Sequence, residues 1–458
     1  MLRQLAAAVA LVMVNDGSAV RPTGPTADSV FAFVDVSVLP MDRERMLEHY
    51  TVVVRGARIA AMGPMRSVTV PAGAVRIDGR GKFLMPGLVD MHAHFMAGTG
   101  DSTDGAARQF ALFLANGVTT ARGLGGPPGY LATRNRANSG ELLAPTLILA
   151  SRSINNNSVG SPAAAAQAVR DAKAVGYDLI KTHGGFDRAT YDSMIAAARL
   201  AGLPVSGHVS AGYGLYHALE SGQQGEHLDG YLAALAGDTG KAAEWGDEQI
   251  VTDPAILARL REDRIPAVVE ATRRSGTCAG PTLALFRLVV SGARAEEMAN
   301  WPELQYVSPQ MRAAFASQVQ QMGGPPPGDA GAERFIQVRD RLVMALHRAG
   351  VPLLAGGDSP QFFLVPGYSL HREMEAFRQA GLSPYAVLET ATVNPARCLG
   401  QAREFGTVET GKRADLLLLD SDPRTSLAAR EHVMGVMTRG RWIDGTGLSA
   451  LLERFHSR

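Results

Sequence analysis

The chain has 458 residues, of which 46% are hydrophobic, and its 45 basic side chains almost balance its 44 acidic ones. This length suits two to three ordinary domains, or one large barrel with an accessory domain. A formal net charge of +1 gives no electrostatic reason to bind nucleic acid or an anionic membrane surface. Fifty glycines fit a loop-rich globular enzyme and not a disordered or fibrous protein.

The first residues have the pattern of an export signal. An arginine precedes an apolar run from Leu5 to Val14, and small residues follow up to Ala19. This pattern predicts a signal peptide over residues 1–19 and therefore a periplasmic or secreted protein. If the signal is not genuine, the expected location is the cytoplasm. The run is too short to cross a bilayer, and no later stretch is long and apolar enough to do so.

Both ends of the chain read as β structure. Residues 28–84 contain short runs rich in Val and Ile, such as "SVFAFVDVSVL", broken by Gly and Pro. A similar texture returns over residues 400–447, for example in "GTVETGKRADLLLLDSDP". This texture is typical of antiparallel strands. We expect one small β-sandwich domain built from both ends.

The middle of the chain, residues 85–399, alternates between apolar runs and Ala-rich amphipathic stretches. Alternation of this kind predicts parallel βαβ units. Together with the strand that ends at the first histidines, the apolar runs make eight β units; the other seven span residues 117–125, 144–153, 177–185, 203–210, 222–230, 279–286 and 351–360. The predicted fold class is therefore α/β, a (β/α)8 TIM-like barrel.

The two cysteines, Cys278 and Cys398, are too few for a disulfide framework or a cysteine-based zinc site. We expect both to be unpaired and to pack as small hydrophobic side chains.

Chemistry-bearing side chains stand where the predicted strands end. In an extended chain, residues i and i+2 point the same way, so His92 and His94 face one small volume. Active sites of barrels of this kind lie at the carboxyl ends of the strands. The side chains at those ends are His92, His94, Lys181, His208, His227 and Asp358. Any one of them alone is an ordinary strand-end residue, but together they predict a divalent metal site, with zinc favoured.

Lys181 is unusual in this company, because a free ammonium would be repelled by metal cations. If carbon dioxide carboxylates its amine, the product is an anionic oxygen ligand that can bridge two metals. Two such cations would lie about 3.5–4 Å apart and share a hydroxide nucleophile.

The order His-x-His, lysine, histidine, histidine, aspartate over eight βα units resembles the amidohydrolase superfamily in its binuclear, carboxylated-lysine form. Several phrases strengthen the resemblance, and point to the imidazolonepropionase-like and prolidase-like branch with its dipeptidases and ochratoxin-type amidases. They are "MPGLVDMHAHF", "GVTTARGLG", "IKTHGG", "EHLDGY", "AGGDSP" and "GTVETGKRADLLLLDSDP". The similarity runs from about residue 30 to about residue 445.

Carried over by position, the resemblance implies a first metal on His92, His94 and Asp358, and a second on His208 and His227. Carboxylated Lys181 would bridge them. Asp358 would be the catalytic residue that orients the bridging hydroxide and moves its proton to the leaving nitrogen. One position departs from many relatives: Gly123 stands where they carry an acidic residue, which reshapes the pocket.

Three further residues are candidate substrate contacts. Tyr231 lies just past His227, His183 shares a strand face with Lys181, and Arg122 ends the second strand, where its planar fork suits an anionic group. For each of them a packing or structural role is the alternative.

The sequence thus predicts a metal-dependent hydrolase that cleaves the C–N bond of a small amide, such as a dipeptide, an N-acyl amino acid or an ochratoxin-like amide. Hydrolysis of a cyclic amide, an imidazolone-type ring or an ester would use the same metal site. A catalytically inactive metal-binding or ligand-binding barrel is the non-enzyme alternative. The expected partner is a small molecule, not a nucleic acid, and a homo-oligomer is left open.

Overall fold

The computed structural model describes residues 29–95, 103–236, 257–427 and 429–456. The expected signal peptide lies outside these residues. Within them, no helix has both the length and the apolar character that a membrane crossing requires.

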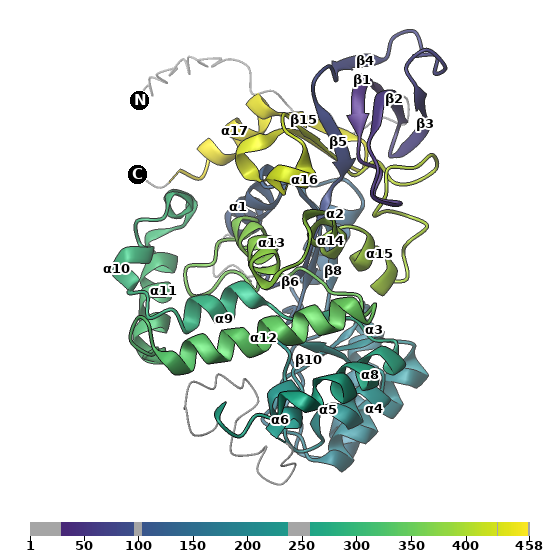
Figure 1. Ribbon diagram of the computed structural model, residues 1–458. Coiled ribbons are helices and arrows are strands. Elements are labelled where there is room, and N and C mark those ends of the chain that lie inside the picture. The colour runs from purple at the N-terminus through teal and green to yellow at the C-terminus, as the bar shows by residue number, and fades with distance from the viewer. Residues whose placement is uncertain (1–28, 96–102, 237–256, 428, 457–458) are drawn as a thin grey trace, which may run out of the picture.

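Strands from both ends of the chain join in one sheet (Figure 1). Its order is β15-β14-β13-β5-β1-β2-β3, and β4 pairs with β1. The two ends meet where β5 pairs antiparallel with β13. The strands are β1 (Val30–Val38), β2 (Leu47–Arg55), β3 (Arg58–Pro64), β4 (Val75–Asp78), β5 (Phe83–Pro86), β13 (Leu416–Leu419), β14 (Val433–Thr438) and β15 (Arg441–Asp444).

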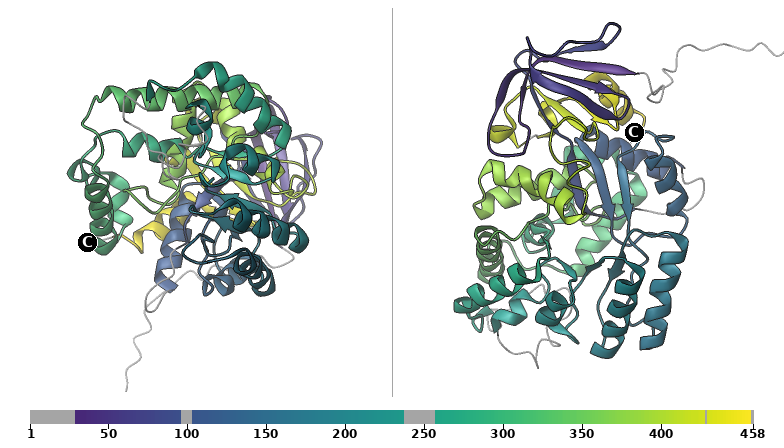
Figure 2. Two further views of the ribbon diagram at one scale, coloured as in Figure 1. Left: turned by 90° about the horizontal axis from the view of Figure 1, so that it is seen from below. Right: turned by 90° about the vertical axis from the view of Figure 1, so that its right-hand side faces the viewer.

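The four leucines of β13 explain how this sheet is attached to the rest of the molecule. Side chains alternate between the two faces of a strand. Leu416 and Leu418 pack with Phe33 and other residues of the sheet's own core. Leu417 and Leu419 belong to the large core that the sheet shares with the middle of the chain. Figure 2 shows the sheet seated against one end of the helical part.

The middle of the chain contains seven short parallel strands in two groups. The first group is β6 (Leu88–Ala93), β7 (Val118–Gly123) and β8 (Thr146–Leu149), and the second is β9 (Ile180–Thr182), β10 (Val205–Gly207), β11 (Gln224–Glu226) and β12 (Ala279–Gly280). A parallel bridge between Ala150 and Leu179 links the two groups. The predicted α/β class is confirmed.

The eighth apolar run, 351–360, contributes isolated bridges instead of a regular strand. Leu353 bridges to Ala279, and Ser359 bridges to Ala93, so the parallel pairing returns to β6. The run lies so close to β6 that a Cβ at Gly356 would be 2.6 Å from the Cβ of His92. Two consecutive glycines, Gly356 and Gly357, permit this approach.

Helices follow the strands in chain order, as the alternation predicts. They are α1 (Thr103–Ala115), α2 (Tyr130–Asn138), α3 (Pro162–Val175), α4 (Arg188–Ala201), α5 (Gly214–Glu220), α6 (Tyr231–Ala236), α8 (Ile265–Ser275), α9 (Leu283–Val289), α10 (Ala295–Met298), α11 (Pro309–Met322), α12 (Ala330–Arg348), α13 (Tyr368–Ala380), α14 (Pro384–Thr390), α15 (Val393–Cys398), α16 (Pro423–Ser426) and α17 (Gly445–Glu453). Short 3-10 helices are η2 (Glu262–Arg264), η3 (Pro302–Tyr306) and η4 (Arg430–His432).

The local sequence explains where such helices begin and end. Ser161 caps α3 by accepting a hydrogen bond from the backbone N–H of Ala164, and Pro162 occupies the first turn. Gly176, with φ of 93°, ends the same helix in the left-handed conformation that glycine adopts readily.

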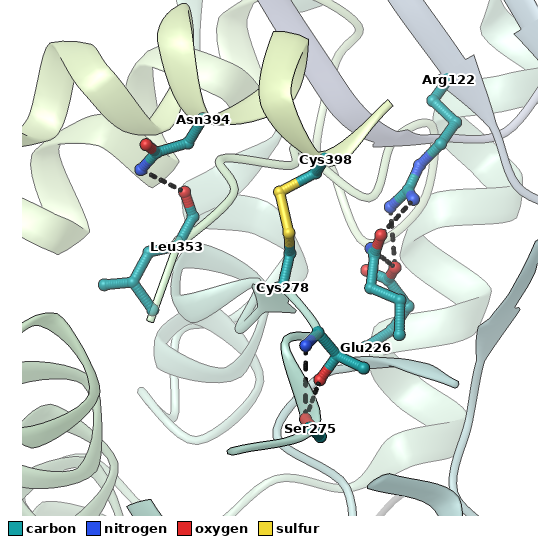
Figure 3. The surroundings of a disulfide bond; sticks show 9 residues. Arg122, Glu226, Ser275, Cys278, Leu353, Asn394 and Cys398 are labelled. Atoms are coloured by element: carbon teal, nitrogen blue, oxygen red, sulfur yellow. Dashed lines mark hydrogen bonds and ion pairs between the residues drawn. A yellow bond between two sulfur atoms is a disulfide. The ribbon is translucent and has the colours of Figure 1, made fainter. Parts of the chain in front are cut away.

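The prediction of two unpaired cysteines is wrong, because Cys278 and Cys398 form a disulfide. Cys278 directly precedes β12, and Cys398 ends α15 (Figure 3). The two are 120 residues apart in sequence, yet their Cα atoms are 6.3 Å apart. No local pattern marks such a pair. Leu353 bridges to Ala279 of β12, and the side chain of Asn394 in α15 donates to the carbonyl of Leu353, so the eighth run links the two elements.

Candidate active site

The His-x-His pair lies at the carboxyl end of β6 and faces Asp358. His94 Nε2 is 2.8 Å from Asp358 Oδ1, and His92 Nε2 is 3.4 Å from the same oxygen. His92 is 1% exposed, whereas 38% of the His94 side chain is accessible. The backbone holds the arrangement, since the N–H of Asp358 donates to the carbonyl of His92 and the N–H of His94 donates to that of Ser359.

The other two strand-end histidines extend this group across the strand ends. The ring centroid of His227 is 4.7 Å from that of His92 and 4.6 Å from that of His208. His227 Nδ1 lies 2.7 Å from the hydroxyl of Thr282, and His208 Nδ1 lies 2.8 Å from a carboxylate oxygen of Asp229. Burial lowers the pKa of both imidazoles well below the ordinary value, so the neutral, ligating form is favoured.

Lys181 lies in β9 and is 1% exposed. Its Nζ has no hydrogen-bond partner among the described residues. Burial lowers the pKa of this amine, although the carboxylates of Glu226 and Asp358 oppose the effect. A buried amine without a partner is costly to keep, which indicates that another group completes its surroundings.

These residues fit a metal centre. Ligand atoms of His92, His94 and Asp358 all lie within 4.8 Å of one another. His92 Nε2, like Lys181 Nζ, is buried and has no hydrogen-bond partner in the described part of the chain. Imidazole nitrogens with carboxylate oxygens are the ligand set of zinc and related divalent ions.

The three candidate substrate contacts have different surroundings. His183 lies at this face, and its ring centroid is 4.3 Å from that of His208. The hydroxyl of Tyr231 shares a hydrogen bond of 2.9 Å with Thr272 of α8, which is a contact between helices. Arg122 is buried, and its guanidinium donates to the carbonyl of Met91, to Gln224 and to Glu226. A substrate anion would have to displace Glu226 to reach Arg122.

The space beside Gly123, at the end of β7, is filled by Phe95. A Cβ at Gly123 would lie 2.4 Å from two carbons of the Phe95 ring. That ring stacks on Tyr130, with centroids 5.1 Å apart. The Phe95 and Tyr130 rings therefore form an aromatic wall at the end of β7.

Sequence reasoning missed four residues that hold the imidazoles or their backbone. Glu226 contacts His92, Asp229 contacts His208 and Thr282 contacts His227, while Asp90 accepts hydrogen bonds from the N–H groups of His92 and Gly357. A signal existed for Asp90, because it precedes His92 by two residues on the same strand face. Thr282 is 55 residues from its partner, and no sequence spacing indicates that contact.

Comparisons with known proteins place this geometry in a family. A model described as "Amidohydrolase family" matches residues 83–443. Imidazolonepropionase from Aromatoleum aromaticum is 28% identical over 424 residues, which cover 86% of this chain and 91% of that protein.

Solved structures agree on the fold. A bottromycin amidohydrolase superposes with a TM-score of 0.70 at 25% identity, covering 93% of this chain and 91% of that one. A Xaa-Pro dipeptidase with bound methionine gives 0.66 at 18% identity, covering 91% and 100%. The A. niger ochratoxinase gives 0.63 at 18% identity, covering 92% and 97%. The resemblance drawn from the motifs is confirmed, as is a hydrolase acting on carbon–nitrogen bonds: the chain belongs to the amidohydrolase family.

Proposed function

We propose that this amidohydrolase is a metal-dependent enzyme that cleaves the C–N amide bond of a small substrate, such as a dipeptide, an N-acyl amino acid or an ochratoxin-like amide. One observation carries the proposal: four imidazoles and the Asp358 carboxylate converge at the carboxyl ends of parallel strands, where the buried Lys181 amine has no hydrogen-bond partner in the described part of the chain. Barrel enzymes place their chemistry at that end.

In this proposal His92, His94 and Asp358 would hold one ion, and His208 and His227 would hold a second. Lys181, if carboxylated on Nζ, would supply a further oxygen ligand. Its lowered pKa supports this modification, since the neutral amine is the form that reacts with carbon dioxide. Zinc is the favoured metal. Bound divalent ions would polarise the carbonyl group of the substrate and lower the pKa of the attacking water.

The residues of the chain have separable roles. The Asp358 carboxylate faces His94 and His92, where it can accept the proton of the attacking water and pass it to the leaving nitrogen. Asp229 and Thr282 occupy Nδ1 of His208 and His227, which fixes how these rings are turned. Phe95 and Tyr130 limit the pocket beside the second strand. His183 is the substrate contact favoured by its position beside His208.

A second candidate function is hydrolysis of a cyclic amide or an imidazolone-type ring. The similarity to an imidazolonepropionase over 86% of this chain favours it. An ester hydrolase would use the same residues. A catalytically inactive barrel is disfavoured, because all six candidate metal ligands are present.

The proposed architecture has two parts, a barrel and a smaller β domain. The ring of parallel pairs is a (β/α)8 barrel over residues 85–399, and the sheet from both ends is a β-sandwich of residues 28–84 and 400–447.

Residues 1–19 direct export. The Cys278–Cys398 disulfide is suited to an exported protein, because disulfides form and persist in oxidising compartments. The balanced charge supports a small-molecule partner and not a nucleic acid. A homo-oligomer is compatible with this arrangement.

The deciding experiment measures metal content and hydrolysis on the same sample. The purified protein is analysed for metals per chain, then assayed against dipeptides, N-acyl amino acids, cyclic amides and esters, with and without chelator. Close to two ions per chain and chelator-sensitive release of an amino acid are expected. Two ions per chain with hydrolysis of cyclic amides alone would support the second candidate function over the first. Absence of tightly bound metal would contradict both.

Lys181 is tested separately by Lys181→Met, which has a similar length and no amine. We expect loss of the second ion and loss of activity. The fold should be retained, because methionine fills the same space without placing a polar amine in the interior. Full activity and two ions in the variant would contradict the carboxylation proposal.

A further inference from the structure

A buried carboxylate, Glu226, lies directly behind the His-x-His pair. Glu226 ends β11, is fully buried and projects into the interior enclosed by the parallel strands. Its Oε2 is 3.0 Å from His92 Nδ1. Glu226 precedes the candidate ligand His227, but its own side chain serves the ligand on a different strand, 134 residues away.

The two oxygens of this carboxylate are used differently. Oε1 accepts hydrogen bonds from the Arg122 guanidinium, the Ser206 hydroxyl and the Gln224 amide, each at 2.7 Å. Figure 3 shows the Arg122 guanidinium facing Glu226. Oε2 is left to His92 as its one described hydrogen-bond partner. Three donors on one side thus fix the carboxylate and aim the other oxygen at the imidazole.

The backbone is shaped around the same oxygen. A Cβ at Gly280 of β12 would lie 2.5 Å from Glu226 Oε2, so a larger residue there would push the carboxylate out of place. Gly356 gives the matching clearance for the Cβ of His92. The close approach on both sides of the His92–Glu226 contact depends on residues without side chains.

The hydrogen bond determines which nitrogen of His92 is free. A carboxylate can only accept a hydrogen bond, so the proton of the neutral His92 ring is on Nδ1 and the lone pair is on Nε2. Nε2 points toward the candidate metal position, 3.4 Å from Asp358 Oδ1, and forms no hydrogen bond with a described residue. Partners of this kind orient metal-binding histidines and raise their basicity.

We propose that Glu226 is a positioning residue that holds His92 with Nε2 available for the metal, and that Arg122, Ser206 and Gln224 hold Glu226. This inference rests on the proposed metal-dependent function. It also gives Arg122 a structural role, since the guanidinium, a candidate contact for a substrate anion, donates to the carboxylate behind His92.

The test separates positioning from simple charge balance. Removing Glu226 alone would leave the buried Arg122 guanidinium without its salt-bridge partner, so the variant would be unstable for that reason. We therefore compare two double variants that both lack the cation, Arg122→Met/Glu226→Leu and Arg122→Met/Glu226→Gln. They differ in one respect, since glutamine keeps an oxygen that can accept from His92 Nδ1 and leucine does not.

The readouts are thermal unfolding, metal affinity by chelator competition, and the visible absorption spectrum of the cobalt(II)-loaded protein. We expect similar unfolding temperatures for the two variants, metal affinity about 10- to 100-fold weaker with leucine than with glutamine, and an altered cobalt spectrum with leucine alone. Equal affinity and equal spectra in the two would overturn the proposal.

A third variant keeps every charge. Gly280→Ala displaces the carboxylate by steric contact, and we expect weaker metal binding with Glu226 and Arg122 both present. Unchanged affinity in folded Gly280→Ala protein would count against the proposal. If the wild-type protein itself holds no metal, the proposed function fails first, and this inference fails with it.

Discussion

The two ends of the parallel strands contrast in how their polar groups are satisfied. At the carboxyl end, His92 Nε2 and Lys181 Nζ are buried without hydrogen-bond partners among the described residues, and Asp358 and His227 have positive φ angles of 46° and 64°. At the amino end, the disulfide joins the start of β12 to α15, and Asn394 of α15 donates to the carbonyl of Leu353 (Figure 3).

A pocket lies at the amino end of the strands, but the Arg122 guanidinium that lines it is already hydrogen-bonded within the protein. A cavity of about 620 Å³ is lined there by residues that include Arg122, Pro204, Cys278, Pro352 and Cys398. The guanidinium of Arg122 is engaged by Glu226 and Gln224. Cavity size alone therefore does not mark the functional end. What distinguishes the carboxyl end is that His92 Nε2 and Lys181 Nζ, both without hydrogen-bond partners among the described residues, share it with further histidines and the Asp358 carboxylate.

The contrast predicts that substitutions at the carboxyl end affect catalysis most. Asp358→Asn keeps the size of the side chain but removes the base, and we expect kcat/KM to fall by about 10²–10⁴-fold on whichever substrate the panel identifies. Asp263→Asn is the matched control, because Asp263 is exposed and pairs with Arg261 on the surface. Activity of Asp358→Asn close to that of the control would remove Asp358 from the mechanism.

At the amino end, the largest expected effect is on stability. The disulfide closes a span of 120 residues, so reduction, or the double change Cys278→Ala/Cys398→Ala, is expected to lower the free energy of unfolding by about 4 to 5 kcal/mol. Urea unfolding at fixed zinc concentration measures this. Metal content and kcat/KM of the folded protein should not change. Loss of metal from folded, reduced protein would show that the two ends are coupled.

A smaller effect on stability is expected from Glu373, a buried carboxyl group that contacts the backbone just after β12. Glu373 accepts hydrogen bonds from the N–H groups of Leu283 and Ala284, yet burial raises its pKa from 4.5 to about 7. Between these values the folded state keeps a proton that the unfolded state releases, so stability falls as pH rises from 4.5 to 7, by about 3 kcal/mol. Urea unfolding at several pH values should show this slope, and Glu373→Gln should remove it. An identical slope in both proteins would contradict the assignment.

The smallest expected effect concerns Tyr231. Burial raises the pKa of its hydroxyl to about 12, and the group bonds Thr272. Tyr231→Phe should therefore cost about 1 kcal/mol of stability and leave KM unchanged. A tenfold or larger rise in KM with unchanged stability would support the prediction that Tyr231 contacts the substrate.

The candidate ligands were accessible to sequence reasoning because each one ends an apolar run. Strand alternation places His92 and His94 on one side, and the carboxyl ends of parallel strands lie together. Residues that serve those ligands from other strands were not accessible in the same way. Glu226 directly precedes His227 in the chain, but this adjacency does not indicate that its carboxylate contacts His92.

What the sequence alone determined is local and periodic: the α/β alternation, the β-rich ends and the order of the candidate strand-end ligands follow from spacing along the chain. What the tertiary structure decided is which distant groups meet. The disulfide between Cys278 and Cys398 and the ion pair between Arg122 and Glu226 both join elements that are far apart in the chain. Spacing sets the direction in which a side chain points, but contacts across 104 or 120 residues exist only after the strands have assembled.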